Sequence, residues 1–238
     1  MNVLTRLWDQ VYASQPAPPA WVVGVTALAA LLLVLNTASW RLAGKVITIA
    51  HEGGHALVSV LSGRRLEGIR LHTDSSGVTY SRGKRRGPGM VLTAAAGYVT
   101  PPLLGAGAAA LLAARHPAAL LWLALVLLAA TFLAVRNAFG ALAVLVTAAG
   151  VFAVSYYASA AVQAGFAYLA AWFLLLGGMR PALELTRRRR GSRSGSRSGL
   201  SDADQLARLT GVSRGVWVTA FVLIAAAALA LGTRLLVP

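Results

Sequence analysis

Long apolar runs separated by short polar segments dominate the chain. Each run is close to the length that an α-helix needs to cross a hydrocarbon core of about 30 Å. Seven runs predict seven transmembrane helices, at 21–40, 43–61, 88–114, 117–135, 138–157, 160–179 and 216–236. The fold class expected from this pattern is therefore an all-α polytopic membrane protein.

The third run contains a potential break. Pro101 and Pro102 follow Thr100 inside it. Proline lacks a backbone N–H and its ring clashes with the preceding helical turn, so two prolines predict a kink or an interruption of the helix. Irregular backbone at membrane depth is tolerated where it lines protein or a water-filled cavity. The sequence therefore predicts a path for water here.

The segment 64–86 interrupts the apolar pattern between the second and third runs. Two short alternating stretches, 66–72 and 77–82, are joined by 73–76 and predict a β-hairpin. An edge strand of such a hairpin can pair with an extended substrate by strand addition. A hairpin that only holds loops apart fits the sequence equally well, and both interpretations stay open.

The second polar segment covers 180–214. Its middle, 187–197, is rich in Arg, Gly and Ser and has no apolar residues from which to build a core. A topology anchor is favoured over a contact with anionic lipid. Ser201 fits the N-cap of a short helix over 202–209, which Gly211 would end. The expected organisation is an N-terminal segment (1–20), a membrane domain (21–179), this basic loop (180–214) and a last transmembrane helix (215–238).

Composition and charge agree with a membrane protein. Hydrophobic residues make up 57% of the chain, charged residues only 12%, and the mean hydropathy is +0.67. The net charge of +15 does not indicate a nucleic-acid partner, because the basic residues cluster between apolar runs. With a cytoplasmic N-terminus, seven crossings place all but four of the 22 Lys and Arg residues in the cytoplasm; the exceptions are Arg41, Lys45, Arg115 and Arg234. The expected location is a bilayer, and the Ala-, Leu-, Arg- and Gly-rich composition points to a bacterial plasma membrane.

The candidate chemistry lies in the second run, at His51-Glu52-Gly53-Gly54-His55. On a helix, His-Glu-x-x-His places both imidazoles on one face, where they can hold one Zn²⁺. The glutamate then lies where it can take a proton from an attacking water. The alternative is a purely structural role, in which the two histidines hydrogen-bond to neighbouring helices. That alternative leaves the acid between them unexplained, and ionisable residues inside a bilayer are functional candidates.

A third ligand must come from few residues. The chain has no cysteine, so a zinc ion would be held by His and carboxylate oxygen alone. The remaining His and acidic residues are Asp9, Glu67, His72, Asp74, His116, Glu184, Asp202 and Asp204.

The motif at 51–55, followed by Ala56-Leu57 and a turn containing Gly63, resembles the site-2 protease family of intramembrane zinc metallopeptidases. The segments 71–79, 95–98 and 201–203 are similar to its compact branch in bacteria and plants. The resemblance implies cleavage in or near transmembrane segments of membrane-protein substrates. It also implies a site in which Glu52 is catalytic and Zn²⁺ is held by His51, His55 and Asp202, with Asp204 as the alternative third ligand and Glu184 as a weaker one.

The sequence departs from that family at one point. The family's Asp stands in an Asn-Pro…Asp-Gly pattern on a later transmembrane helix, whereas here the sixth run ends Gly177-Gly178-Met179-Arg180-Pro181 with no acid. An inactive relative that binds membrane partners is therefore an alternative hypothesis. A small transporter is a third, from the polar residues at depth. Neither the substrate-binding residues nor the oligomeric state follow from the sequence.

Overall fold

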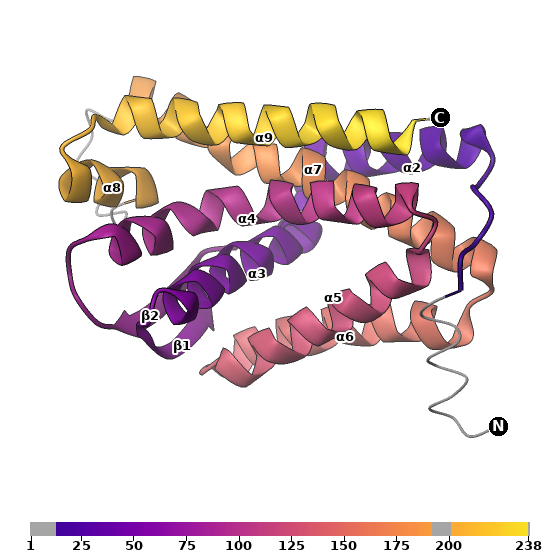
Figure 1. Ribbon diagram of the computed structural model, residues 1–238, viewed down its shortest axis with the longest axis horizontal. Coiled ribbons are helices and arrows are strands. Elements are labelled where there is room, and N and C mark those ends of the chain that lie inside the picture. Colours follow the sequence, from indigo (N-terminus) through magenta and orange to yellow (C-terminus); the bar gives the residue numbers. More distant parts are fainter. Residues whose placement is uncertain (1–12, 192–200, 238) are drawn as a thin grey trace.

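The computed structural model describes residues 13–191 and 201–237 and is mostly helical (Figure 1). The start of the predicted N-terminal segment (1–12) and the part of the basic linker from residue 192 lie outside the described residues. In chain order the elements are α2 (Ala20–Leu35), α3 (Thr37–Leu61), β1 (Arg65–Leu71), β2 (Gly77–Arg82), α4 (Pro88–Ala113), α5 (Pro117–Ala134), α6 (Ala138–Tyr157), α7 (Ala160–Gly191), α8 (Asp202–Thr210) and α9 (Arg214–Leu236).

The helices confirm a polytopic membrane protein. Five of those described, α4, α5, α6, α7 and α9, are long and apolar enough to cross a membrane. A sixth span results if α2 and α3, bent by 101° at their junction, cross as one unit. The structure thus gives five or six spans where the sequence predicted seven. Large apolar side chains such as Val126, Leu133 and Leu223 are exposed on the flanks of the bundle, where lipid would cover them.

The expected boundary between the first two spans is wrong. A span over 21–40 was predicted, but α2 ends at Leu35 and α3 begins at Thr37. Asn36 stands between them, and its side-chain oxygen accepts hydrogen bonds from the backbone N–H groups of Ala38 and Ser39. This N-cap satisfies donors that have no partner inside the helix, so a new helix starts there in a new direction.

The predicted interruption of the third span is also wrong, because α4 continues through Pro101 and Pro102. Both prolines are fully buried and pack against α7. A Cβ atom on Gly178 of α7 would lie only 2.7 Å from Cδ of Pro102, so the missing side chain lets the two helices approach. The helix therefore continues through both prolines, which are covered by α7.

The sixth apolar run does not end at Met179, since α7 continues to Gly191. Arg180, expected to open the loop, is bound inside the fold. Its Nε lies 3.0 Å from Oε1 of Glu184, its guanidinium lies 4.5 Å from the ring centroid of Trp40, and it donates to the carbonyl of Val34 at the end of α2. The expected domain boundary at 179/180 therefore falls within a helix that also supports the α2–α3 junction.

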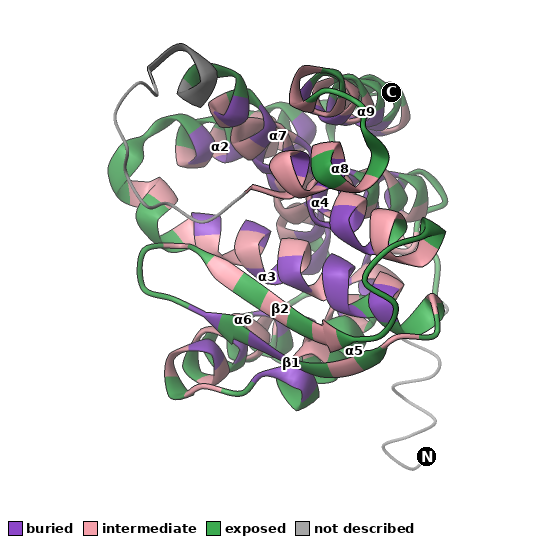
Figure 2. Ribbon diagram, turned by 90° about the vertical axis from the view of Figure 1, so that its left-hand side faces the viewer, coloured by how far each residue is buried: buried purple, intermediate pink, exposed green. Residues whose placement is uncertain are grey.

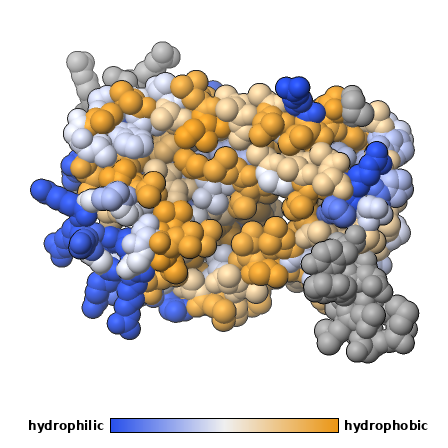
Figure 3. All heavy atoms as spheres, in the orientation of Figure 1, coloured by the Kyte–Doolittle hydropathy of each residue, from blue (hydrophilic) through white to orange (hydrophobic). Residues whose placement is uncertain are grey.

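The bundle has two distinct ends. In Figure 1, α4, α5, α6, α7 and α9 run mainly along the long axis, and the hairpin and α8 lie together at one end. The core follows α7, whose Ala167, Ala171 and Leu175 are fully buried among residues of α2, α4 and α9. Hydrophilic residues gather at the hairpin end, and apolar residues cover most of the visible flank (Figure 3).

The hairpin is confirmed as an antiparallel β1–β2 pair with a bulge between Leu66 and Gly68. Its turn is attached to α3, because Lys45 Nζ donates to the Thr73 carbonyl and Thr48 Oγ1 donates to the Ser75 carbonyl. The edge of β1 that faces away from β2 is covered by the α5–α6 connection. There the Asn137 side chain accepts from the Leu71 backbone N–H and donates to the Leu71 carbonyl. In the end-on view of Figure 2, β2 is the strand nearer to α3.

Candidate metal centre

Helix α3 presents the two motif histidines on one face, as the spacing predicts. The Nε2 atoms of His51 and His55 lie 3.1 Å apart, and the rings meet nearly at right angles. His55 is buried, while the His51 side chain is 20% exposed. The two nitrogens therefore converge on one point at the edge of the core, open on one side.

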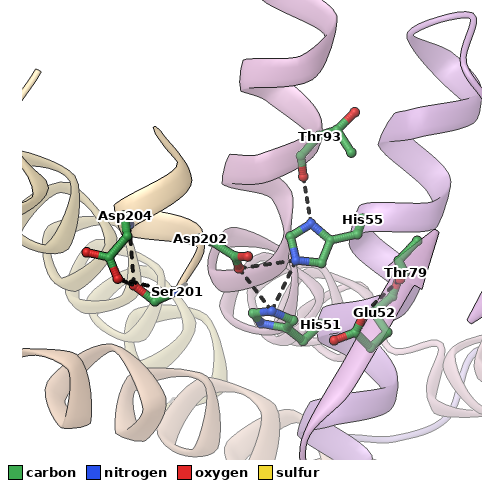
Figure 4. Close-up of polar contacts among 8 residues, drawn as sticks. All are labelled: His51, Glu52, His55, Thr79, Thr93, Ser201, Asp202 and Asp204. Atoms are coloured by element: carbon green, nitrogen blue, oxygen red, sulfur yellow. Dashed lines mark hydrogen bonds and ion pairs between the residues drawn. The ribbon is translucent and has the colours of Figure 1, made fainter. Parts of the chain in front are cut away.

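Asp202 of α8 completes a group of three. Its Oδ2 atom lies 3.1 Å from Nε2 of His51 and 3.2 Å from Nε2 of His55 (Figure 4). Ligands of a tetrahedral zinc ion at 2.0–2.1 Å lie about 3.3 Å from one another, so the spacing fits Zn²⁺. Within the described residues, these three form the one group of His and acidic side chains close enough to hold a metal ion.

Local sequence explains how Asp202 reaches the histidines. The Ser201 side chain accepts from the Asp204 backbone N–H, and the Asp204 side chain accepts from the Ser201 backbone N–H, which forms a capping box at the start of α8. Ala203 and Leu206 are fully buried against α4 and α9. The cap fixes where α8 begins and the apolar face fixes how it docks, so Asp202 points at α3.

The other candidate ligands lie elsewhere. Asp204 turns toward its own cap and forms an ion pair with Arg214 at 3.0 Å, and Glu184 is paired with Arg180. His72 contacts Ser76 in the hairpin turn, and His116 precedes α5. Of the two acids considered for α8, the structure brings only Asp202 to the histidines.

A backbone carbonyl orients His55. Its Nδ1 lies 2.6 Å from the carbonyl oxygen of Thr93 in α4. A carbonyl can only accept, so Nδ1 carries a hydrogen. Nε2 faces Asp202, to which it donates when the ring is protonated, and it offers a lone pair when the ring is neutral. Such an outer partner is the usual way in which proteins fix the tautomer of a metal-binding histidine.

Missing side chains make room for the cluster. A Cβ atom on Gly97 of α4 would collide with Nε2 of both His51 and His55, and one on Gly54 would collide with the Thr100 side chain. The missing side chain at Gly54 therefore lets α4 approach α3 closely. Tyr98 lies beside His51 in an edge-to-face contact, with ring centroids 4.9 Å apart, and stacks on Phe221 of α9.

The carboxylate of Glu52 is held by the hairpin rather than by the histidines. Thr79 Oγ1 of β2 lies 2.7 Å from Glu52 Oε2 and 3.1 Å from the Glu52 carbonyl. Gly77 lies against the same side chain, since a Cβ atom there would be 2.7 Å from Glu52 Oε1. Glu52 is only 4% exposed, so its position depends on these contacts.

Electrostatics favour an ionised Asp202. Burial alone raises the pKa of a carboxyl group. Hydrogen bonds from His51 and His55, together with their positive charge, outweigh burial and hold the pKa of Asp202 well below its usual range. Asp202 is therefore ionised over the physiological pH range.

The comparison with known families agrees with this geometry. A family model described as peptidase M50B-like matches residues 24–232, a stretch that includes α3, the hairpin and Asp202. The chain belongs to the peptidase M50B-like family. The resemblance to site-2 proteases drawn from the motif is thereby confirmed. No curated protein and no solved structure matches the chain.

Several residues of this M50B-like site were not assigned a role from the sequence. Thr79 and Thr93 hold Glu52 and His55, and Gly77 and Gly97 leave them space. Thr79 lies on the inward face of a strand next to the motif helix, which is a weak signal for such a contact. The role of the Thr93 carbonyl has no sequence signal at all, because every residue has a carbonyl.

Proposed function

We propose that the chain is an intramembrane zinc metalloprotease that cleaves peptide bonds in or near transmembrane segments of membrane proteins. The observation that carries the proposal is the convergence of three ligand atoms, within 3.2 Å of one another, from helices 147 residues apart. A catalytic acid, Glu52, follows the first of these ligands directly.

His51, His55 and Asp202 would hold the zinc ion and leave a fourth position for water or substrate. When bound there, Zn²⁺ would lower the pKa of a water molecule and polarise the scissile carbonyl. Glu52 would accept the proton of the attacking water and pass it to the leaving amine. The Thr79 hydroxyl would keep the Glu52 carboxylate at the site without taking part in proton transfer.

The free edge of β2 supports substrate binding by strand addition. Ile69 and Leu71 direct backbone groups away from β2 to bond Arg136 and Asn137. In an antiparallel ladder, the residues opposite them, Thr79 and Gly77, also point their N–H and C=O groups outward. Among the described residues, no further strand pairs with these outward groups of β2. An extended substrate paired there would pass beside Glu52.

An inactive relative is the alternative. It is favoured by the absence of the family's Asn-Pro…Asp-Gly pattern. The retention of Glu52, its hydrogen bond to Thr79 and the supply of an acid by α8 support the active form. A chain that only binds partners would have no use for a buried glutamate in this position.

Zinc analysis of the detergent-purified protein tests the metal site. We expect one zinc ion per chain in the parent and in Glu52→Gln, and loss of the ion in His51→Ala and Asp202→Asn. Glu67→Gln is the matched control, because Glu67 is an exposed acid of β1 that pairs with Arg82 and lies outside the cluster, and it should keep its zinc. A parent that takes up no zinc after loading would favour the inactive relative.

Cleavage of a model membrane protein tests the catalytic step. The probe is a single transmembrane helix with a glycine or proline in its span, which eases local unwinding. We expect zinc-dependent hydrolysis that falls at least about a hundredfold in Glu52→Gln, the usual range for loss of a general base. Equal hydrolysis by Glu52→Gln and the parent would show that another group is the base.

A further inference from the structure

Unpaired cations cluster on the hairpin and on the link that follows it. The side chains of Arg65, Arg70, Lys84, Arg85 and Arg86 are exposed, and none of them has an acidic partner among the described residues. Their basic neighbours are already occupied: Arg82 pairs with Glu67 at 2.7 Å, and Arg64 donates to Ser81 and to the Lys84 carbonyl. Arg70 lies over the Tyr80 ring, with 6.0 Å between Cζ and the ring centroid. We refer to these five cations without an acidic partner as the hairpin cation patch.

The patch points along the long axis of the molecule. Figure 3 shows hydrophilic side chains projecting beyond the apolar body at the hairpin end, and Figure 2 shows the hairpin crossing that end. Lipid tails would surround the flanks of the bundle, and headgroups would lie around its ends. The patch belongs to the hairpin that holds Glu52, so its position beside the site favours an acidic peptide segment over a lipid surface.

The patch lies beside the expected path of a substrate. Strand β2 starts at Gly77, against Glu52, and each residue of a strand advances the chain about 3.3 Å. Arg82 at the other end of β2 is therefore roughly 17 Å from the catalytic acid, and Lys84, Arg85 and Arg86 follow. A substrate strand on the free edge of β2 would run from the cleaved bond toward these charges.

We propose that the hairpin cation patch selects substrates with an acidic segment next to the cleaved bond. The acidic residues are expected about five or more positions from that bond, where a strand paired with β2 reaches the link. The inference rests on the proposed function, because it assigns the flanking specificity of the same site. Several exposed charge pairs act together, so we expect an affinity difference of about tenfold at low salt.

Binding of two matched peptides tests the proposal. Each peptide carries one apolar helix and a fluorescent label, followed by an extended segment with either four Glu or four Gln. The full chain with Glu52→Gln, in nanodiscs of neutral phosphatidylcholine, is titrated by fluorescence anisotropy. The Glu peptide should bind about tenfold more tightly at 0.05 M salt, and most of that preference should vanish at 0.5 M, where charges are screened within about 4 Å.

Two double variants with equal charge loss locate the effect. Arg85→Gln with Arg86→Gln, two exposed cations of the link, should remove most of the preference for the Glu peptide. Arg115→Gln with Arg234→Gln removes two cations that lie away from the hairpin and should leave the preference intact. Equal binding of both peptides, or a preference that survives in the hairpin variant, would overturn the proposal. So would a preference that disappears when anionic lipid is added to the nanodiscs, because the patch would then serve the membrane surface.

Cleavage measured in parallel separates this inference from the proposed function. A preference for the Glu peptide without zinc-dependent cleavage by the parent would leave the acidic selectivity standing and overturn the protease. Zinc-dependent cleavage of both peptides at the same rate, with equal binding, would leave the protease standing and overturn the acidic selectivity.

Discussion

At the scale of single residues, Gly97 limits the space at the cluster. A methyl group at this position would collide with Nε2 of both histidines, so Gly97→Ala should displace a ligand nitrogen. We expect zinc affinity to fall at least about tenfold, as for other changes that reorient metal-binding histidines. Gly107→Ala is the control, because it lies on the same helix with no atom within 4 Å of the added Cβ. Competition with a chelator would measure both, and equal affinities would contradict the prediction.

The sequence predicted some residues of the site and not others, for a physical reason. His51, Glu52 and His55 lie within one turn of a helix, so their spacing alone brings them together. The choice between Asp202 and Asp204 as third ligand depends on a contact between residues 147 positions apart in the chain, which the sequence does not reveal. The family resemblance favoured Asp202, and the structure brings that residue to the histidines while the capping box and Arg214 hold Asp204.

At the scale of elements, α8 carries a proposed ligand without being a transmembrane span. It docks through an apolar face on which Leu206 is fully buried among Ala94, Val218 and Phe221. Leu206→Ala should cost about 2–5 kcal/mol of docking energy. Zinc affinity should then fall although no ligand has changed, whereas Arg208→Ala, on the exposed face of α8, should bind zinc like the parent. Isothermal titration checks both, and parental affinity in Leu206→Ala would show that Asp202 is held independently of this packing.

Elements with local signals were predicted well. Ser201 and Gly211 mark the ends of α8, and alternating residues mark the hairpin, so both were expected where the structure has them. The break at Asn36 was missed because the predicted span was extended across Asn36, Thr37 and Ser39 to Trp40, although Asn is a preferred N-cap residue. The extension of α7 past Pro181 depends on Arg180 meeting α2 and α3, which no local pattern indicates.

At the scale of the whole molecule, the bent α2–α3 unit changes the expected topology. Seven crossings would put the start and the end of the chain on opposite sides. In the structure, Gln15 bonds Arg115 at the α4–α5 turn, and α2 begins at the same end of the bundle as the end of α9 (Figure 1). The hairpin and α8 lie at the other end. Six crossings would therefore place both termini of the described chain opposite the site.

The distribution of charge then predicts which end is cytoplasmic. The hairpin end holds the basic residues of the α3–α4 connection, and the opposite end holds only Arg115 and Arg234 among the described residues. The positive-inside rule places the hairpin and the site in the cytoplasm and residue 14 outside, whereas seven crossings place residue 14 inside. The chain has no cysteine, so single replacements can be labelled without background. In bacterial spheroplasts, an impermeant maleimide should label Ser14→Cys and Ser159→Cys, and should reach Thr73→Cys and Ser213→Cys only after lysis. Protection of both Ser14→Cys and Thr73→Cys would contradict this prediction. It would place residue 14 on the same side as the hairpin, so α2 and α3 would have to cross the membrane separately.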